Sequence, residues 1–349
     1  MLRITYGPWG ESLAELAEAA RAAEEAGADA VWVPELHRSA PVSAAAVAQA
    51  TSTARVGTAI ALAFPRSPMI TALEALDLDE ISGGRFVLGL GSGVQKLNVD
   101  WHHVDWDKPV THLRETVRNI RAFWADCTTG APIDLPGERE PMKIRGYRRP
   151  YPVQRTEIPI HLAAMGPALT RLAGEIADGW ISHELTSPRF LQERILPEIE
   201  AGIAKGGRTR NAVEVVTSSC CSVDADPAVA RRRSAGMVGF YATVRTYADF
   251  FDFHGLADDQ QKVIDAFSGA TTAGELAGHV SDAMVDALTL SGTRDQVAES
   301  IAAYDGIADT IKLTPPTHGL SPDEIRAAQR EVIALIRHLN QQGITGGTA

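Results

Sequence analysis

Short runs of aliphatic and β-branched residues alternate with longer stretches of helical periodicity along most of the chain. Ala30–Val33 contains no polar residue, as expected of a parallel strand that is buried on both faces. The stretch before it carries Leu13, Leu16 and Ala20 at the spacing of one helix face. Repeated strand–helix units of this kind predict an α/β fold with a parallel sheet.

The alternation continues to the C-terminal part of the chain and predicts eight strands. The predicted strands are Arg3–Gly7, Ala30–Val33, Arg55–Leu62, Arg85–Gly91, Ile158–Ala164, Gly179–His183, Val213–Val223 and Thr310–Leu313. Eight such units favour a closed (β/α)8 TIM barrel over an open sheet. A barrel takes roughly 250 residues and tolerates insertions, so we expect the 349 residues to form a single domain, 1–349.

Two segments interrupt the alternation. Residues 130–159 are rich in Pro, Gly and Arg, and residues 241–290 are mostly polar with a helical pattern. They follow the fourth and seventh predicted strands, so a barrel places them on its carboxyl face, where active sites lie. We interpret both insertions as lids over that face, with passive surface insertion as the alternative.

The charge balance and the apolar content limit the classes of partner. The chain has 33 Lys and Arg against 44 Asp and Glu, a net charge of −11, so it is not expected to bind nucleic acid or anionic membranes. No apolar run approaches the ~18 residues of a membrane-spanning helix, and the N-terminus lacks a signal-peptide pattern. We therefore expect a cytoplasmic protein. Cys220 and Cys221 are expected on opposite sides of a core strand rather than in a disulfide.

Several segments together resemble one enzyme family. Ile81–Gly93 reads ISGGRFVLGLGSG, and it follows the FPRSP run of Phe64–Pro68. Ala163–Pro167 reads AAMGP, and Ala177–Trp180 reads ADGW. In this order the segments resemble the luciferase-like flavin oxidoreductases over nearly the whole chain. The pattern is most similar to the branch that uses the deazaflavin coenzyme F420.

The resemblance implies a cofactor across the barrel mouth. It implies a non-proline cis peptide bond at Ala59–Ile60, in a bulge of the third strand on which the isoalloxazine-like ring rests. It also implies that the ribityl phosphate lies at Ala164–Gly166, where a helix N-terminus offers free N–H groups. His161 and His183 end the fifth and sixth predicted strands, so each is either a ligand contact or a hydrogen-bonded core histidine. The predicted cofactor contacts are Ala59, Ile60, Gly91, Ser92, Gly93, Ala164, Met165, Gly166 and His183.

The residues for proton transfer match the family less directly. Its members commonly carry an acid followed at once by a catalytic His at the end of the second strand, whereas this chain reads Glu35-Leu36-His37. We predict catalytic roles for Glu35 and His37, because the near-neutral pKa of histidine suits acid–base work. His103, in the polar and aromatic stretch after the fourth strand, is the third candidate. A metal site there is a minor alternative without matching ligand spacing, and none is predicted.

Lys143–Arg155 contains five basic residues and no acid. Coenzyme F420 carries a phosphodiester and an oligoglutamate tail, whereas FMN carries one phosphate. We consider this segment either a contact for that tail or a solvated hairpin face.

These observations predict an oxidoreductase that transfers a hydride between F420 and a small organic substrate, in a homodimer. The cofactor performs the difficult chemistry and the protein orients it. One alternative is a monooxygenase that uses reduced FMN and O2. Two others are a catalytically idle flavin-binding barrel and a metal-dependent barrel hydrolase, whose ligand pattern the sequence lacks.

Overall fold

The chain forms two compact units in a computed structural model that describes residues 1–269 and 271–343. Unit 1 comprises Met1–Val31, Ser182–Leu196 and Val215–Ala349. Unit 2 comprises Trp32–Ile181 and Pro197–Glu214. Each unit consists of parallel strands followed by helices, and each is treated by itself below. The expectation of a single domain stays a prediction.

The strands of unit 1 are parallel neighbours in the order β11–β10–β12–β1–β2. Their bounds are β1 Arg3–Tyr6, β2 Ala30–Val33, β10 Glu214–Val223, β11 Leu290–Gly292 and β12 Thr310–Thr314. Thr5 and Ser218 both lie opposite Lys312 in the ladders, so the three side chains share one face of the sheet. On the other face, the Tyr6 hydroxyl donates to Gln329 Oε1 at 2.9 Å. The face that carries Tyr6 therefore packs against the helix Pro322–Gln341, to which Gln329 belongs.

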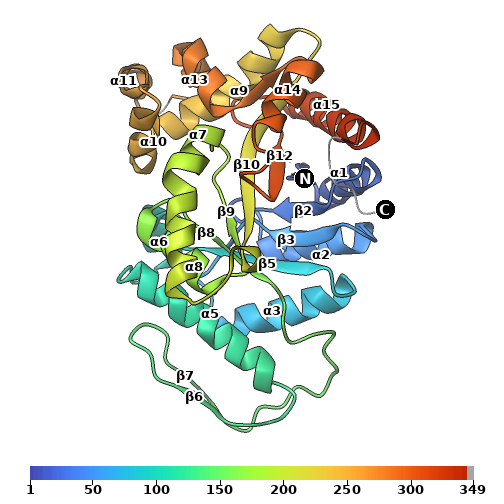
Figure 1. Cartoon of the computed structure of the whole chain (residues 1–349), viewed down its shortest axis with the longest axis vertical. Coiled ribbons are helices and arrows are strands. Elements are labelled where there is room, and N and C mark those ends of the chain that lie inside the picture. The colour runs from blue at the N-terminus through green and yellow to red at the C-terminus, as the bar shows by residue number, and fades with distance from the viewer. Residues whose placement is uncertain (270, 344–349) are drawn as a thin grey trace. The chain divides into compact units, whose positions relative to one another are not determined.

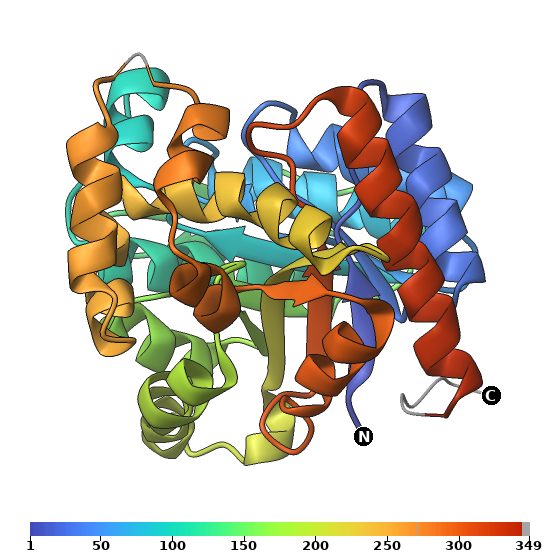
Figure 2. The same cartoon turned by 90° about the horizontal axis from the view of Figure 1, so that it is seen from above.

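Helices alternate with the strands of unit 1 along the chain. The longer ones are α1 Leu13–Glu25, α9 Pro227–Ala242, α11 Ala257–Ala266, α14 Arg294–Ala302 and α15 Pro322–Gln341. The shorter ones are α7 Pro188–Phe190, α10 Ala248–Phe253, α12 Ala273–Leu276 and α13 Asp282–Leu288. Figure 2 shows α15 beside α1. A capping box of Ser321 and Glu324 starts α15, and its buried residues include Ile325 and Val332.

The strands of unit 2 are also parallel, in the order β3–β5–β8–β9, with β4 paired to β5. Their bounds are β3 Arg55–Thr58, β4 Ala61–Leu62, β5 Phe86–Gly91, β8 Ile160–Ala163 and β9 Gly179–Ile181. The third predicted strand is thus two short strands, and the Ala59–Ile60 peptide bond between them is cis, which confirms that prediction. A Cβ at Gly89 would lie 1.8 Å from the Thr58 carbonyl oxygen, so only glycine permits this approach of the strands.

Helices flank the strands of unit 2 in chain order. They are α2 Ala40–Ala50, α3 Pro68–Ile81, α4 Gln95–His102, α5 Pro109–Asp126, α6 Pro167–Ile176 and α8 Leu196–Lys205. Figure 1 shows α3 and α5 running side by side. The Trp124 indole N–H of α5 donates to the Ala72 carbonyl of α3 at 3.0 Å, so the two helices are joined by a buried hydrogen bond.

The two insertions differ in structure. Residues 130–159 contain a short antiparallel hairpin of β6 Ile133–Leu135 and β7 Met142–Ile144. The described part of 241–290 is largely helical, as its pattern predicts. The sixth predicted strand, Gly179–His183, ends early at Ile181, so His183 lies beyond the strand.

Apart from β11, a short strand that pairs with the end of β10, the described residues of the two units hold eight parallel strand positions that are each followed by helical structure. They are β1, β2, β3 with β4, β5, β8, β9, β10 and β12. This order matches the predicted (β/α)8 fold. Among the described residues, no helix is both long and apolar enough to span a membrane. Cys127, Cys220 and Cys221 are buried free thiols, and burial raises the pKa of Cys220 to about 12.

Candidate functional site

The carboxyl ends of three neighbouring strands meet at one edge of the unit 2 sheet. Leu62 at the end of β4 lies opposite Gly91 of β5, and Gly91 lies opposite Ala163 of β8. Because the strands are parallel, the segments that follow them begin side by side. Unit 2 therefore brings together the predicted contacts at Ala59 and Ile60, at Gly91 to Gly93, and at Ala164 to Gly166. His183 belongs to unit 1.

Hydrogen bonds from the second strand fix the bulge on both sides. Ala59 N donates to the Val33 carbonyl at 2.8 Å, and Glu35 N donates to the Ile60 carbonyl at 3.0 Å. A Cβ at Gly91 would lie 2.7 Å from Ile60 Cδ1. The missing side chain at Gly91 thus leaves room for Ile60 next to the bulge.

The Glu35 carboxylate holds the chain that leaves the bulge. It accepts two hydrogen bonds from the Arg66 guanidinium, both at 2.6 Å, and one from Leu62 N at 2.8 Å. Hydrogen bonding to Glu35, opposed by burial, raises the pKa of Arg66. Arg66 Nε also lies 3.4 Å from Glu74, whose pKa is raised by burial against the charge of Arg66. Both Glu35 oxygens therefore accept hydrogen bonds that position the chain after the bulge.

Asn98 of α4 fixes the glycine turn after β5. This residue is fully buried, and its side-chain N–H group donates to the Ser92 carbonyl at 2.8 Å and the Val94 carbonyl at 3.0 Å. Gly93 between them has a φ of 66°, which favours glycine. The sequence analysis did not identify Asn98. The only indication in the sequence is a polar residue a few positions after the GLGSG run, and this does not show which carbonyl groups the side chain binds.

The N-terminus of α6 is open to solvent. Gly166 is the exposed N-cap residue, and no side chain caps this helix. The first amides of a helix have no intrahelical acceptors. Because Pro167 at the first position has no N–H, the free donors here are the amides of Ala168 and Leu169. A Cβ at Gly166 would meet nothing within 4 Å. This terminus has the donors and the space that an anion needs.

The predicted proton-transfer histidines lie on the surface of unit 2. His37 is exposed in the segment after β2, next to Leu36, which is 51% exposed. His103 is exposed in a left-handed conformation at the C-terminus of α4, where its backbone N–H donates to the Asn98 carbonyl. Within the described part of the chain, neither imidazole makes a hydrogen bond. Their catalytic roles, like that of Glu35, stay predictions.

His161 is part of the core. Its ring is buried, 5.6 Å from the Trp32 ring, and its Nε2 lies 3.5 Å from the Glu214 carboxylate. Glu214 also accepts two hydrogen bonds from Arg55. Of the two alternatives for His161, the structure favours a core histidine.

The basic residues of Lys143–Arg155 have partners within unit 2. Lys143 pairs with Asp134 at 3.1 Å, Arg149 with Asp77 at 2.8 Å, and Arg155 with the buried Asp79 at 2.8 Å. Arg145 approaches Asp134 and Arg148 donates to the Thr128 carbonyl. These contacts occupy much of the segment, and both alternatives for it, a contact for the F420 tail and a solvated hairpin face, stay predictions.

His183 lies in unit 1, among aromatic rings. Its ring centroid lies 4.2 Å from that of Tyr241 and 4.5 Å from that of Tyr247. Both ring nitrogens are buried, and in the described residues neither has a hydrogen-bond partner. Burial lowers the pKa of His183 to about 4, with Glu184 opposing and Lys312 and His318 adding to the shift. The imidazole is therefore neutral near pH 7.

Glu184 and Lys312 form an ion pair beside His183. Lys312 Nζ lies 3.2 Å from Glu184 Oε1, and the Lys312 side chain is 6% exposed. Burial, the largest single cause, raises the pKa of Glu184. The charges of Lys312, His183 and His318 and the hydrogen bond from Lys312 together outweigh it, so the net pKa is lowered. Sequence reasoning missed this pair; the one signal was a lysine inside the strand sequence TIKLT.

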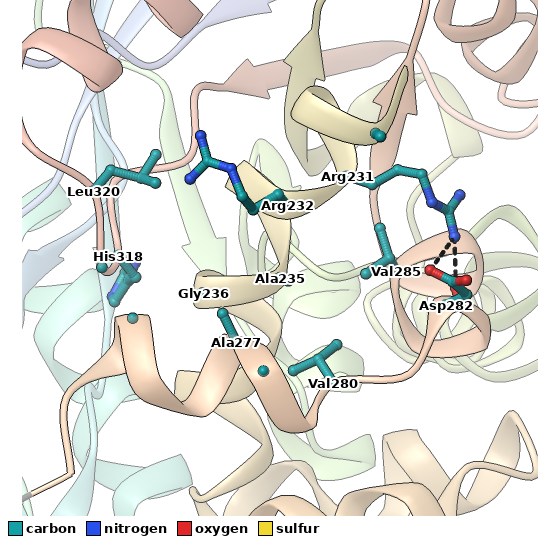
Figure 3. Close-up of a pocket in the computed structure, with 14 residues that line it drawn as sticks. Arg231, Arg232, Ala235, Gly236, Ala277, Val280, Asp282, Val285, His318 and Leu320 are labelled. Atoms are coloured by element: carbon teal, nitrogen blue, oxygen red, sulfur yellow. Dashed lines mark hydrogen bonds and ion pairs between the residues drawn. The ribbon is translucent and has the colours of Figure 1, made fainter. Parts of the chain in front are cut away.

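Unit 1 also contains a cavity of about 540 Å³ between α9, α12 and the chain before α15. Its lining includes Arg231, Arg232, Asp282 and His318, and Figure 3 shows Arg231 reaching Asp282 across one end. The His318 ring lies 5.7 Å from that of Tyr241, so the cavity borders the aromatic rings around His183. No group of three or more His, Cys, Asp or Glu residues in the described ranges is placed to hold a metal ion.

Comparison with known proteins identifies relatives over almost the whole chain. The model of the luciferase-like monooxygenase family matches residues 3–310. The 5,10-methylenetetrahydromethanopterin reductase of Archaeoglobus fulgidus is 30% identical over 334 residues, which are 93% of this chain and 96% of the relative.

Two solved structures share the fold. The coenzyme F420-dependent tetrahydromethanopterin reductase of Methanopyrus kandleri has a TM-score of 0.81 at 24% identity, covering 96% of this chain and 97% of that one. The oxygenating constituent of 3,6-diketocamphane monooxygenase from Pseudomonas putida, in complex with FMN, has a TM-score of 0.68 at 17% identity, covering 97% of both chains. The likeness confirms the predicted TIM-barrel fold.

Proposed function

The chain belongs to the luciferase-like monooxygenase family, and on this basis we propose that it is an oxidoreductase that transfers a hydride between coenzyme F420 and a small organic substrate. The observation that carries the proposal is the edge of unit 2 where β4, β5 and β8 end together. Among the relatives, the Methanopyrus kandleri reductase is named as F420-dependent. That name supports F420 over FMN for this chain.

The residues at this edge fit a deazaflavin. The bulge at Ala59–Ile60 would support the ring. The turn Gly91–Gly93 would approach the ring closely, because Ser92 is its one residue with a side chain. The open N-terminus of α6 after Ala164–Gly166 would receive the phosphate. When bound, the deazaflavin supplies a hydride donor or acceptor at its C5 atom.

The protein's own part in the reaction is to orient the ring and to move a proton. In the proposal, Glu35 and Arg66 keep the bulge in place, because the carboxylate bonds to both Arg66 and the backbone beyond it. His37 and His103 are the candidates for proton transfer, since both imidazoles have free nitrogens for substrate or water. Glu35 is thereby given a positioning role in addition to the catalytic role predicted for it.

We also propose that the chain acts as a homodimer. Large apolar side chains are exposed on unit 2, among them Val42 at the start of α2 and Ile70 at the start of α3. Helix faces of this kind are suitable for a self-complementary interface. Sedimentation velocity of the full chain at micromolar concentration tests this, and a monomer at all concentrations would contradict it.

Titration of the purified full chain with F420 and, separately, with FMN tests the cofactor. Five of the six tryptophans, all except Trp9, lie in unit 2, so quenching of tryptophan fluorescence reports on this unit. Micromolar or tighter binding of F420 with weak binding of FMN supports the proposal. Preference for FMN, together with oxygen uptake by the protein with reduced FMN, supports the monooxygenase alternative instead. Tight binding of either cofactor without turnover supports the idle flavin-binding alternative.

A further inference from the structure

The insertion 130–159 is joined by side chains to the cofactor edge, which is the edge of unit 2 where β4, β5 and β8 end together. Its tip, residues 137–140, lies between β6 and β7, and Figure 1 shows this hairpin close to α5. We infer that the tip holds the cofactor edge in place and that His112 of α5 is the positioning residue between them. The inference rests on the proposed function, in which this edge binds the cofactor.

The first step of the argument is the attachment of the tip to α5. The Glu115 carboxylate of α5 is buried. It accepts from three consecutive backbone N–H groups, those of Glu138 at 2.9 Å, Arg139 at 2.8 Å and Glu140 at 2.7 Å. The buried Asn119 side chain donates to the Glu140 carbonyl at 2.6 Å. The tip is therefore held through its backbone, independently of its own side chains.

The second step is the contact between the tip and His112. Glu140 Oε1 lies 2.7 Å from His112 Nε2, and because a carboxylate only accepts, Nε2 carries the hydrogen. The residue is 5% exposed, and among the described residues its other ring nitrogen, Nδ1, is buried without a partner. The Glu140 carboxylate therefore supplies the hydrogen bond that orients the imidazole.

The third step is the packing of two rings on Phe64. The His112 ring stacks on that of Phe64, with the centroids 3.9 Å apart and 7° between the planes. The Trp106 ring meets Phe64 in a T-shaped contact at 5.4 Å. Arg139 of the tip donates to the Asp105 carbonyl at 2.7 Å and so fixes the residue before Trp106. The tip thus holds both aromatic neighbours of Phe64.

The fourth step leads from Phe64 to the cofactor edge. Phe64 is buried and is the second residue after β4. Leu62 N donates to the Glu35 carboxylate at 2.8 Å, and Ala63 N donates to the carbonyl of Gly91, a predicted cofactor contact, at 3.0 Å. A displaced Phe64 ring would move this backbone and weaken both hydrogen bonds. The role inferred for the insertion is distinct from a lid and from a passive surface insertion.

Glu140→Ala tests the inference, because it removes the side chain that orients His112 and keeps the backbone hydrogen bonds of the tip. Amide hydrogen exchange of the full chain without cofactor is followed by mass spectrometry in the peptide that contains Leu62 and Ala63. We expect exchange about fivefold faster than in the native chain. Glu138→Ala is the matched control, since its side chain pairs only with the exposed Lys108 among the described residues, and it should exchange at the native rate. Native exchange in Glu140→Ala would overturn the inference.

Calorimetric titration with F420 measures the consequence for the cofactor. The dissociation constant of Glu140→Ala should rise about fivefold. Glu140→Gln, whose amide oxygen still accepts from Nε2, should restore most of the affinity, which a loss of general stability would not explain. Native affinity in Glu140→Ala overturns the inference. If the native chain does not bind F420, the proposed function fails, and hydrogen exchange alone decides the inference.

Double variants test whether His112 and Phe64 form the route. His112→Ala should have the same effect on exchange and affinity as Glu140→Ala, and the double variant should be no worse, because the two residues act in series. In Phe64→Leu, which lacks the stacked ring, Glu140→Ala should likewise have no further effect. Additive effects in these pairs would contradict the role of His112. If His112→Ala does not fold, the pair of Phe64→Leu and Glu140→Ala decides.

Discussion

The Glu35 carboxylate and the Arg66 guanidinium form a bidentate ion pair, with both N···O distances at 2.6 Å. The same carboxylate accepts from Leu62 N, so one side chain joins the second strand to both ends of the segment Leu62–Arg66. The pair is mostly buried, with Glu35 10% and Arg66 19% exposed. This contact sets the position of the chain next to the cis peptide bond and is the basis of the first prediction.

Glu35→Gln should destabilise the protein by about 2 kcal/mol, less than the ~3–5 kcal/mol for breaking a fully buried pair. The reason is that Arg66 keeps its charge but loses the Glu35 carboxylate, and among the described residues only Glu74 at 3.4 Å still faces it. Urea unfolding followed by circular dichroism measures the change. Glu193→Gln breaks the exposed pair with Arg189 and is the matched control, with an expected cost below ~0.5 kcal/mol. Equal costs for the two variants would show that the Glu35 pair contributes no more than a surface pair.

Gly91→Ala should weaken F420 binding while the fold is kept. The new Cβ would lie 2.7 Å from Ile60 Cδ1 and would push that side chain toward the bulge. We expect a rise of the dissociation constant by about tenfold, because a misplaced ring support loses on the order of 1.4 kcal/mol. Fluorescence titration measures it. Gly278→Ala, where a Cβ meets nothing within 4 Å, should leave the constant unchanged. A Gly91→Ala protein with native affinity would remove this turn from the cofactor site.

Asn98→Asp should destabilise the protein more than Asn98→Ala. The amide N–H group donates to two carbonyl oxygens, and aspartate would place a buried oxygen in its position. Loss of the donor alone should cost about 1–3 kcal/mol, and an unpaired buried carboxylate more than that. Thermal unfolding of the two variants gives the order. If Asn98→Asp were the more stable variant, the assigned orientation of the Asn98 amide would be wrong.

Glu175 gives a pH dependence with a defined sign. Hydrogen bonds from Arg114, at 2.6 and 2.7 Å, are the main cause that lowers its pKa to about 2; burial opposes them and Lys205 at 3.0 Å adds to them. Because the unfolded value is about 4.3, this stabilisation is present above about pH 4.3 and is lost as the pH falls toward 2.

Glu175→Gln should therefore lower the stability at pH 7 and flatten its decline between about pH 4.3 and 2. Urea unfolding at a series of pH values measures both effects. Glu299→Gln, at an exposed position of α14, should retain the native profile. An unchanged slope in Glu175→Gln would contradict the lowered pKa.

Much of the local structure followed from the sequence. Ala30–Val33, which contains no polar residue, forms the buried strand β2, and Leu16 and Ala20 of the predicted helix face are buried in α1. The position of the bulge at Ala59–Ile60 came from family resemblance rather than from periodicity. The hairpin within 130–159 was not anticipated in detail, since its two strands have only three residues each.

The sequence by itself determined the order of strands and helices and therefore the barrel fold, because the period of apolar residues is a local property. It also indicated the glycine turn and the helix N-terminus that come together in unit 2. Only the tertiary structure decided the partners of charged and polar groups, such as Arg66 for Glu35 and Lys312 for Glu184. The physical reason is that ion pairs and burial depend on which distant segments pack together, and Glu184 and Lys312 are 128 residues apart in the chain.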